Sequence, residues 1–436
     1  MPPRNPGKHW LLKSWNWKVN MRKLAGLLLL LVTGMQAMAQ LPFSTENKVY
    51  QPQIRTVMCY NDQKEQSIPV ITLKSSEKLL FSFDDLEGGS KNYWYTIVHH
   101  TSDWKLSNLS PIEYLDGFSD DRIVDYDYSS NTLQKYTHYS LRLPNQQISP
   151  KISGNYLLKV YLDGDLNKPV ISQRFYVSEN RVNVGLEIQP SMQVPLRNAN
   201  QKINVNIFQT GTIQNPAADL KVVVMQNNIP YSAVTTKKPS AIKPGELAYK
   251  DPYTNDFGGG NEFRKFDIRS LRVKGAQVQD IQLDTINQVR LFPDIPPTGK
   301  YVRIFDENGN FFIRNQDGRD EQTESDYVNV TFQLDARQGI ANKELYVVGR
   351  FNNYLLTPEY RLHNKPGEDK YQLTLKLKQG VYDYKYVLKD PQTGAVDDTA
   401  LEGSFFETDN GYQVFVYYKS PGSRWEELIG YSQTSR

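Results

Sequence analysis

Apolar and polar residues alternate along most of the chain with a period of two, which is the period of a half-buried β-strand. The clearest example is residues 371–378, YQLTLKLK, where tyrosine and leucine side chains face one side and polar side chains face the other. Residues 380–390 keep this period, so we expect an antiparallel hairpin that turns at Gln379–Gly380. Helical periodicity is scarce, and further strand-like runs are NYLLKVYLDGD, LKVVVMQNN, YVNVTFQLD and YVRIFDENGNFFIRN, the last with a hairpin turn at DENGN.

Many short strands separated by turn residues predict an all-β fold of tandem β-sandwiches, Ig-like or early-set-like. The 28 tyrosines and the aromatic share of 12% agree with this, because aromatic side chains favour strands. We place a first sandwich at residues 41–178, a second sandwich with long loops at 179–325, and a third sandwich at 326–436.

The first 39 residues differ from the rest, because they hold six Lys and Arg and no Asp or Glu. From Met21 they read as a basic start, a short apolar run and an A-x-A ending at Ala37 and Ala39, which is the pattern of a cleavable signal peptide. Residues 1–20 then form an upstream extension, and we expect an exported chain that starts at Gln40. Neither the apolar run nor any later segment is long enough to span a membrane.

The leader also explains the basic net charge. The whole sequence is formally +3, but without the leader 45 Lys and Arg stand against 48 Asp and Glu, which gives −3. The charge therefore gives no support to a nucleic-acid partner. Cys59 is the only cysteine in the chain, which rules out an intramolecular disulfide, and we expect it to be a small core residue of the strand RTVMCYN.

The stretch 256–271, DFGGGNEFRKFDIRSL, holds three consecutive glycines and invites comparison with a nucleotide site. A phosphate loop needs a GK[ST] ending before a helix, and a kinase DFG motif needs HRD and VAIK partners. None of these is present, so we interpret the glycines as turn residues.

Candidate catalytic residues are few. Four histidines follow the leader, and the adjacent His99 and His100 would point to opposite faces of a strand, so they cannot chelate one metal together. Carboxylates beside aromatic residues at 83–89 and 125–128 leave a hydrolase cleft as one alternative. We predict no catalytic, cofactor-binding or metal-binding residue and no small-molecule substrate.

The third predicted sandwich carries the segment ELYVVGRFNNY at 344–354. This segment resembles the VxGxFNxW strand of the glycogen-binding and early-set domains of starch-active enzymes. Tyr354 stands where such domains usually have the sugar-binding tryptophan. The resemblance therefore supports the fold better than it supports sugar binding, and a cell-surface protein that binds α-glucans remains the second alternative.

Several longer segments resemble the plug protein family of the Bacteroidota type IX secretion system, once known only as a domain of unknown function. They follow one another in order through the chain: FDDLEGGSKNYWYTIVHHTSDW, SPIEYLDGFSDDRIVDYDYSSNTLQKYTHYSLRLPN, PKISGNYLLKVYLDGD, IQNPAADLKVVVMQNN, GGNEFRKFDIRSLR, VGRFNNY, LEGSFFETDNGYQVFVYY and RWEELIGY. The resemblance implies a non-catalytic protein of the periplasm, at the inner face of the outer membrane. It also implies a partner, the large outer-membrane translocon β-barrel, whose periplasmic opening the protein seals when the barrel is idle.

The resemblance maps no contact residue onto this chain. We expect a partner surface in the aromatic and acidic segments 93–104 and 114–128, because Tyr and Trp are favoured at interfaces. The competing interpretation is that these residues form the core and turns of the first sandwich. The residues chosen are Tyr93, Trp94, Trp104, Tyr114, Asp120, Asp121, Tyr126 and Tyr128.

Overall fold

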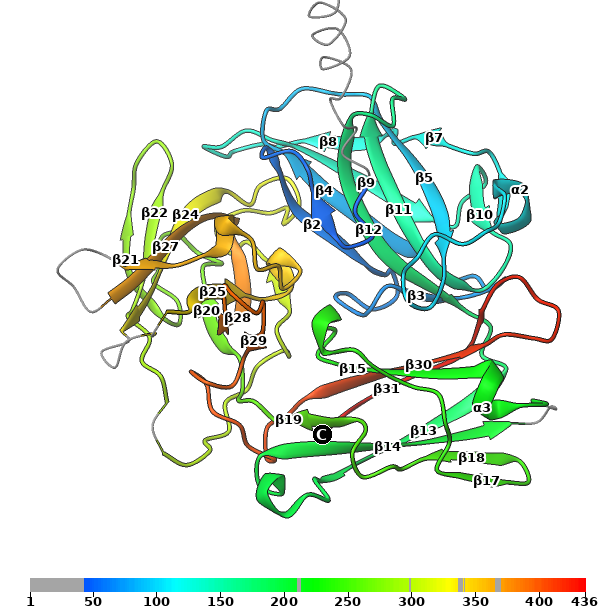
Figure 1. Ribbon diagram of the computed structural model, residues 1–436. Helices are drawn as coiled ribbons and strands as arrows, with labels where there is room; N and C mark the ends of the chain where they lie inside the picture. Colours follow the sequence, from blue (N-terminus) through cyan, green and yellow to red (C-terminus); the bar gives the residue numbers. More distant parts are fainter. Residues whose placement is uncertain (1–42, 210–212, 298, 336–339, 341, 365–369) are drawn as a thin grey trace, which may run out of the picture. The chain divides into compact units, whose positions relative to one another are not determined.

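The computed structural model describes residues 43–436, apart from 210–212, 298, 336–339, 341 and 365–369. Within these residues nearly all regular structure is β-strand in several antiparallel sheets, which confirms the all-β prediction (Figure 1). The expected signal peptide at 1–39, with its extension 1–20 and its cleavage residues Ala37 and Ala39, lies outside the described residues.

Strands from residues 48–178 form two sheets that face each other, and these sheets hold a core rich in tyrosine and phenylalanine. The first sheet has the order β1 (Lys48–Val49), β12 (Pro169–Ser178), β11 (Gly154–Leu162), β5 (Tyr93–His100) and β7 (Asp121–Arg122), with β3 (Val70–Thr72) also paired to β12. The second has the order β2 (Ile54–Asn61), β4 (Leu79–Asp85), β9 (Thr137–Leu143) and β8 (Asp125–Tyr128). A short ladder of β6 (Leu115–Gly117) and β10 (Ile148–Pro150) follows helix α2 (Pro111–Tyr114).

A second pair of sheets combines strands from the middle of the chain with its last two strands. One sheet has the order β13 (Val182–Pro190), β14 (Asn200–Gln209), β18 (Glu246–Tyr249) and β17 (Ala241–Lys243), with β19 (Asp256–Gly258) also on β14. The other has the order β16 (Val234–Thr236), β15 (Leu220–Gln226), β30 (Gly411–Tyr418) and β31 (Glu427–Ser435). Helix α3 (Pro216–Asp219) precedes β15, and η1 (Val194–Leu196) and η2 (Pro230–Ser232) lie in loops.

A third pair of sheets is built around the long strand β28 (Gly380–Lys389). This strand pairs with β20 (Arg264–Asp267), β23 (Phe311–Ile313), β25 (Glu344–Val348) and β29 (Val396–Asp397). The facing sheet has the order β21 (Val278–Gln282), β22 (Gln288–Leu291), β24 (Tyr327–Asp335), β27 (Lys370–Lys378) and β26 (His363–Asn364). The helices η3 (Arg350–Asn352) and η4 (Pro358–Tyr360) follow β25.

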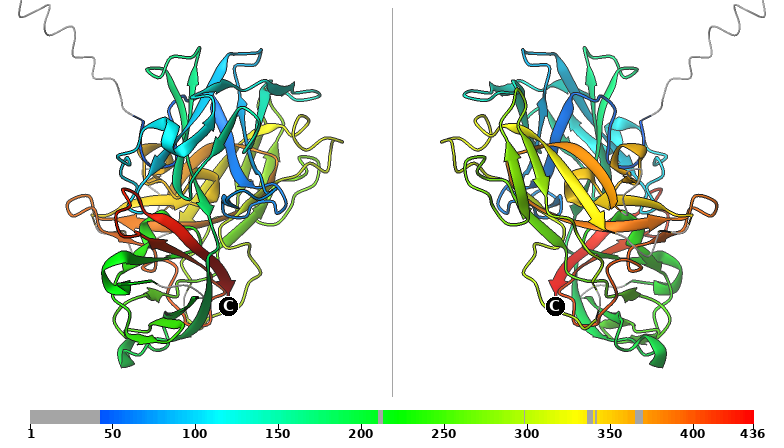
Figure 2. Two further views of the ribbon diagram at one scale, coloured as in Figure 1. Left: turned by 90° about the vertical axis from the view of Figure 1, so that its right-hand side faces the viewer. Right: turned by 90° about the vertical axis from the view of Figure 1, so that its left-hand side faces the viewer.

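Strand pairing joins residues from both sides of position 325, where we expected the second sandwich to end. β15 pairs along its whole length with β30, and β20 pairs with β28. Figure 2 shows the red C-terminal strands among green strands from the middle of the chain. Strands from 179–325 and strands from 326–436 therefore lie in the same sheets. The three-part division of the chain stays a prediction.

Two hairpins expected from the sequence do not form. The strands on either side of Gln379–Gly380 exist as β27 and β28, but they pair with different strands and lie in two different sheets. Gln379 is buried, so this point is a corner where the chain passes between the sheets of a sandwich. The run 301–305 before DENGN is not a strand, and only β23 forms after the turn. Alternation predicts that a strand exists, but it does not identify the neighbouring strand.

Candidate partner-binding surface

The segment 116–128 leads from the edge of one sheet of the first sandwich to the edge of the other. Its residues Asp121 and Arg122 form β7, which pairs with β5. Residues 125–128 form β8, which is the last strand of its sheet and pairs with β9 on one side only. We call residues 116–128 the β7–β8 edge. A free strand edge offers backbone N–H and C=O groups to a partner chain.

The β7–β8 edge is acidic and carries exposed apolar side chains. It contains five aspartates and one arginine. Every residue of β8 is exposed. The exposed large side chains are Phe118 at 63%, Val124 at 66%, Tyr126 at 36% and Tyr128 at 56%. The rings of Tyr126 and Tyr128 pack edge to face with centroids 5.6 Å apart, which holds the two side chains in one arrangement.

The structure separates the residues that we selected for a partner surface. Asp120, Asp121, Tyr126 and Tyr128 lie on the β7–β8 edge, and Asp120 accepts a hydrogen bond from Tyr161 at 2.8 Å. Tyr93 is fully buried, because β5 alternates between the core and the outer face and Tyr93 points inward.

The other three selected residues lie away from this edge. Tyr114 is buried at the end of α2. Trp94 is half-buried on the outer face of β5 beside Gly164. Trp104 is half-buried and packs against Arg174. Phe118 and Val124, which we did not select, extend the apolar part of the β7–β8 edge, and their only signal in the sequence was an apolar residue among aspartates.

The carboxylates that suggested a hydrolase do not meet in one cleft. Asp84 and Asp85 are both buried and bonded within the protein. Asp84 contacts His138 Nδ1 at 2.6 Å and Lys378 Nζ at 2.7 Å, while Asp85 Oδ2 lies 2.7 Å from Lys91 Nζ. Burial opposes the charge on Asp84, but Lys378 and His138 outweigh burial and hold the pKa of Asp84 below its ordinary value. The aspartates of β8 are exposed instead.

Among the described residues, Asp383, which is buried, and Asp306, which is half-buried, are the two carboxyls with strongly raised pKa values. Burial, followed by repulsion from Asp306, raises the pKa of Asp383 to about 7. Burial likewise raises the pKa of Asp306 to about 7. Each accepts backbone hydrogen bonds of the 306–310 turn, and Lys265 Nζ lies 3.9 Å from Asp383 Oδ1. Raised pKa values occur at active sites, but these bonds give the pair a structural role in the turn.

Replacing Asp383 with asparagine is expected to stabilise the protein more at pH 8 than at pH 5. The pKa of an aspartate in the unfolded chain is about 3.9. In the folded protein the pKa of Asp383 is raised to about 7. The free energy of unfolding therefore falls as the pH rises through this window, and asparagine removes that loss. Urea unfolding should show the difference between variant and wild type growing by about 1–3 kcal/mol from pH 5 to pH 8.

The comparison must be made between variants, because other buried groups change stability in the opposite direction. Burial lowers the pKa of His99 to about 4, so its contribution to stability is lost as the pH falls. The exposed Asp127→Asn is the matched control and should show no such pH dependence. A pH-independent effect of Asp383→Asn would mean that the folded carboxyl is ionised.

The segment that resembles a glycogen-binding strand forms a tight turn. The amide of Gly349 donates to Asn352 Oδ1 at 3.0 Å, and Asn352 Nδ2 donates to the Val347 carbonyl at 3.0 Å. Tyr354 is only 4% exposed, so its ring is not available to stack on a sugar. The aromatic residue at the position of the usual sugar-binding tryptophan therefore gives the α-glucan alternative no support.

Within the described ranges, no three His, Cys, Asp or Glu side chains are grouped so as to hold a metal ion. In the same ranges no helix has the length and apolar character needed to cross a membrane. Cys59 is buried in β2, as predicted.

Comparisons with known proteins identify the family. A family model described as the Type 9 secretion system plug protein 1st domain matches residues 54–179, which include the whole β7–β8 edge. A crystal structure of a hypothetical protein from Parabacteroides merdae ATCC 43184 has the same fold, with a TM-score of 0.87 and 31% identity over 90% of this chain and 99% of that chain. No curated protein matches the chain. The chain therefore belongs to the type 9 secretion system plug protein family, and its role is related to type IX secretion.

Proposed function

We propose that this protein is a non-catalytic periplasmic component of the type IX secretion system. In this proposal it binds the outer-membrane translocon barrel and closes the periplasmic opening of the barrel when no substrate is moving. The observation that carries the proposal is the family membership, which rests on the match at 54–179 and on the structural likeness along nearly the whole chain.

A rigid β-protein suits the task of closing a wide opening. A water-filled pore leaks solutes unless a folded body covers it, and sheets with buried cores do not deform easily. The described part of this chain contains three paired-sheet cores. Strand edges and loops can then make the contacts without any segment of the plug entering the membrane.

We assign the contact to the β7–β8 edge. Its free strand offers backbone hydrogen bonds to a strand or extended loop of the barrel, and its tyrosines supply apolar area with polar tips. The five aspartates of the edge would attract a basic surface on the partner. This attraction would raise the rate of association at low salt. The side chains assigned to the contact are Phe118, Val124, Tyr126 and Tyr128, with Asp120, Asp121, Asp125 and Asp127 around them.

The test is a pull-down of the tagged protein from detergent-solubilised envelopes, with partners identified by mass spectrometry. We expect near-stoichiometric recovery of a very large outer-membrane barrel. The double variant Tyr126→Ala/Tyr128→Ala should lower this recovery by about tenfold or more, since aromatic anchors dominate interface energies. The control is Tyr253→Ala, because Tyr253 is 78% exposed and lies outside the edge.

The outcomes separate the general proposal from the assigned surface. If the wild type recovers no barrel, the translocon proposal is wrong. If the wild type and the double variant recover the barrel equally while thermal unfolding shows both folded, the partner binds another surface. Weaker recovery at high salt would support the acidic contact.

A further inference from the structure

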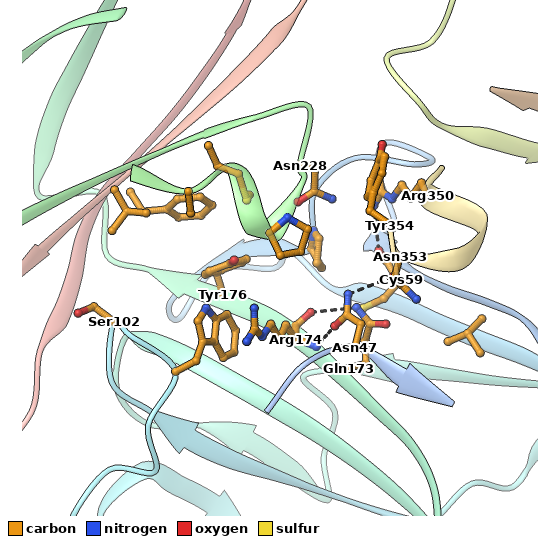
Figure 3. Close-up of a pocket in the computed structure, with 18 of the residues that line it drawn as sticks. Asn47, Cys59, Ser102, Gln173, Arg174, Tyr176, Asn228, Arg350, Asn353 and Tyr354 are labelled. Atoms are coloured by element: carbon orange, nitrogen blue, oxygen red, sulfur yellow. Dashed lines mark hydrogen bonds between the residues drawn. The ribbon is translucent and has the colours of Figure 1, made fainter. Parts of the chain in front are cut away.

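A cavity of about 190 Å³ lies where the first sandwich meets strands β15 and β30 and the turn after β25 (Figure 3). Two arginines, Arg174 and Arg350, are among its lining residues, and Asp103 is the single acidic residue among them. Asp103 already pairs with Lys105 at 2.7 Å. The lining of the cavity thus holds two arginine cations, and its single carboxylate is already paired with a lysine.

Arg174, on β12, presents an unused edge of its guanidinium group. Its Nε donates to the Thr45 carbonyl at 2.5 Å, and its Cζ lies 4.2 Å from the centre of the Trp104 ring. Among the described residues, its Nη1 and Nη2 have no hydrogen-bond partner and no carboxylate lies within ion-pair distance. Figure 3 shows Arg174 between Tyr176 and Asn47. The Nη1–Nη2 edge has the geometry that a carboxylate accepts with both oxygens.

Arg350 adds a positive charge that the described residues do not neutralise. Its guanidinium donates to the carbonyls of Gln66 and Ser67 and to Asn310 Oδ1, all of which are neutral acceptors. Burial lowers its pKa from the ordinary value, which reflects the cost of a charge without a counter-ion. An anion in the cavity would reduce this cost.

Aromatic side chains form one wall of the cavity. Trp104 packs on the edge of Tyr176 with centroids 5.4 Å apart, and Tyr176 stacks on Phe415 at 4.4 Å. Trp104 has a backbone φ of 61°, which is rare for a bulky residue and costs conformational energy. This conformation belongs to the residue whose ring covers the Arg174 guanidinium. The wall suits an aromatic or apolar group beside a bound anion.

We propose that this cavity binds a small organic carboxylate that carries an aromatic or apolar group. Its two oxygens accept hydrogen bonds from Nη1 and Nη2 of Arg174, and its apolar part contacts the Trp104–Tyr176–Phe415 wall. Size supports one ring, because a cavity of about 150 Å³ is known to hold benzene. The inference is independent of the proposed translocon contact, since the β7–β8 edge contributes no lining residue.

The first experiment titrates the full chain with phenylacetate by isothermal calorimetry, and compares it with neutral phenylacetamide. We expect phenylacetate to bind with a Kd of about 0.1–1 mM, because a ligand with so few non-hydrogen atoms can make only a limited number of contacts. Phenylacetamide should bind at least about tenfold more weakly, because it cannot supply a negative charge to Arg174. Equal binding of the two, or no binding of either, would overturn the proposal.

Variants of Arg174 assign the binding to the cavity. Arg174→Met should reduce phenylacetate affinity about tenfold or more, and Arg174→Lys should give an intermediate value, because lysine keeps the charge without the two-point contact. Arg290→Met is the control, since Arg290 is exposed and lies outside the cavity. If circular dichroism shows Arg174→Met to be unfolded, the phenylacetate affinity of Arg174→Lys is used to test the proposal instead. Unchanged affinity in a folded Arg174 variant would contradict the proposal.

The carboxylate has two possible sources, a free acid or the C-terminus of a peptide. Acetyl-Ala-Phe with a free carboxylate, tested beside its amide, distinguishes them. Tighter binding of phenylacetate identifies a free acid, and tighter binding of the peptide acid identifies a chain terminus. Either result supports the carboxylate site, provided that the Arg174→Met variant loses binding of the same ligand.

Discussion

Replacing Lys378 with methionine is expected to lower the free energy of unfolding by about 3–5 kcal/mol. Lys378 is 1% exposed, and its Nζ contacts Asp84 Oδ2 at 2.7 Å and the Gln322 carbonyl at 2.6 Å. Asp84 is completely buried, so methionine would leave a buried carboxylate without its strongest partner. Removal of one member of a buried ion pair is costly for this reason, whatever the net contribution of the intact pair.

The contacts around Lys378 connect parts of the chain that are far apart in sequence. Asp84 is on β4 of the first sandwich, while Lys378 is on β27. Tyr327 on β24 also donates to Asp84 Oδ2, at 2.7 Å, and Lys378 Nζ lies 4.2 Å from the centre of the Tyr136 ring. The variant should therefore weaken the contact between the first sandwich and strands β24 and β27 as well as the local fold. Limited proteolysis should then cleave the variant faster than the wild type.

Two controls separate the charge from the loss of packing. Lys376→Met changes a residue on the same strand whose Nζ, among the described residues, donates only to the Gln134 side-chain oxygen, and it should cost less than about 1 kcal/mol in urea unfolding. The double variant Asp84→Asn/Lys378→Met removes both charges and should be more stable than Lys378→Met alone. A Lys378→Met variant as stable as the wild type would contradict the claim that Lys378 compensates a buried charge on Asp84.

The sequence predicted strands reliably where apolar and polar residues alternate. Residues 327–335 form β24 with the bounds of the run YVNVTFQLD, and 371–378 lies within β27. The pairing of strands was not predictable in the same way. Gln379–Gly380 looked like a hairpin turn but is a corner between sheets, because alternation is the same whichever strand lies alongside.

The candidate surface was predicted only in part. We expected a partner surface that included 114–128, and within it β8 is exposed at all four residues and ends its sheet. The period of alternation is the same in an edge strand and in an inner strand. The cavity was not predicted at all, since Arg174 and Arg350 are separated by a long stretch of sequence and only the folded chain places them around one space.

The three glycines at 258–260 are expected to respond very differently to alanine, although they are adjacent. Gly258 has ordinary room for a methyl group, with Thr399 Cγ2 at 3.5 Å from the position of an added Cβ. Gly260 has open space but a φ of +61°, so Gly260→Ala should cost about 1–2 kcal/mol. At Gly259 an added Cβ would lie 1.9 Å from the Phe405 carbonyl oxygen and 2.8 Å from the Ala199 carbonyl oxygen.

Gly259→Ala is therefore expected to destabilise the protein by about 3 kcal/mol or more, because backbone atoms block the methyl group on both sides. The clash would also disturb the hydrogen bonds from the Gly259 amide to the Ala199 carbonyl at 2.8 Å and from the Phe405 amide to the Gly260 carbonyl at 2.9 Å. Urea unfolding of the three alanine variants should give the order 258, 260, 259 from least to most destabilised. A phosphate loop would behave differently, since its glycines make room for a ligand and alanine would impair binding while leaving stability nearly unchanged. A stable Gly259→Ala variant would therefore contradict the close backbone approach and reopen the question of a ligand at this turn.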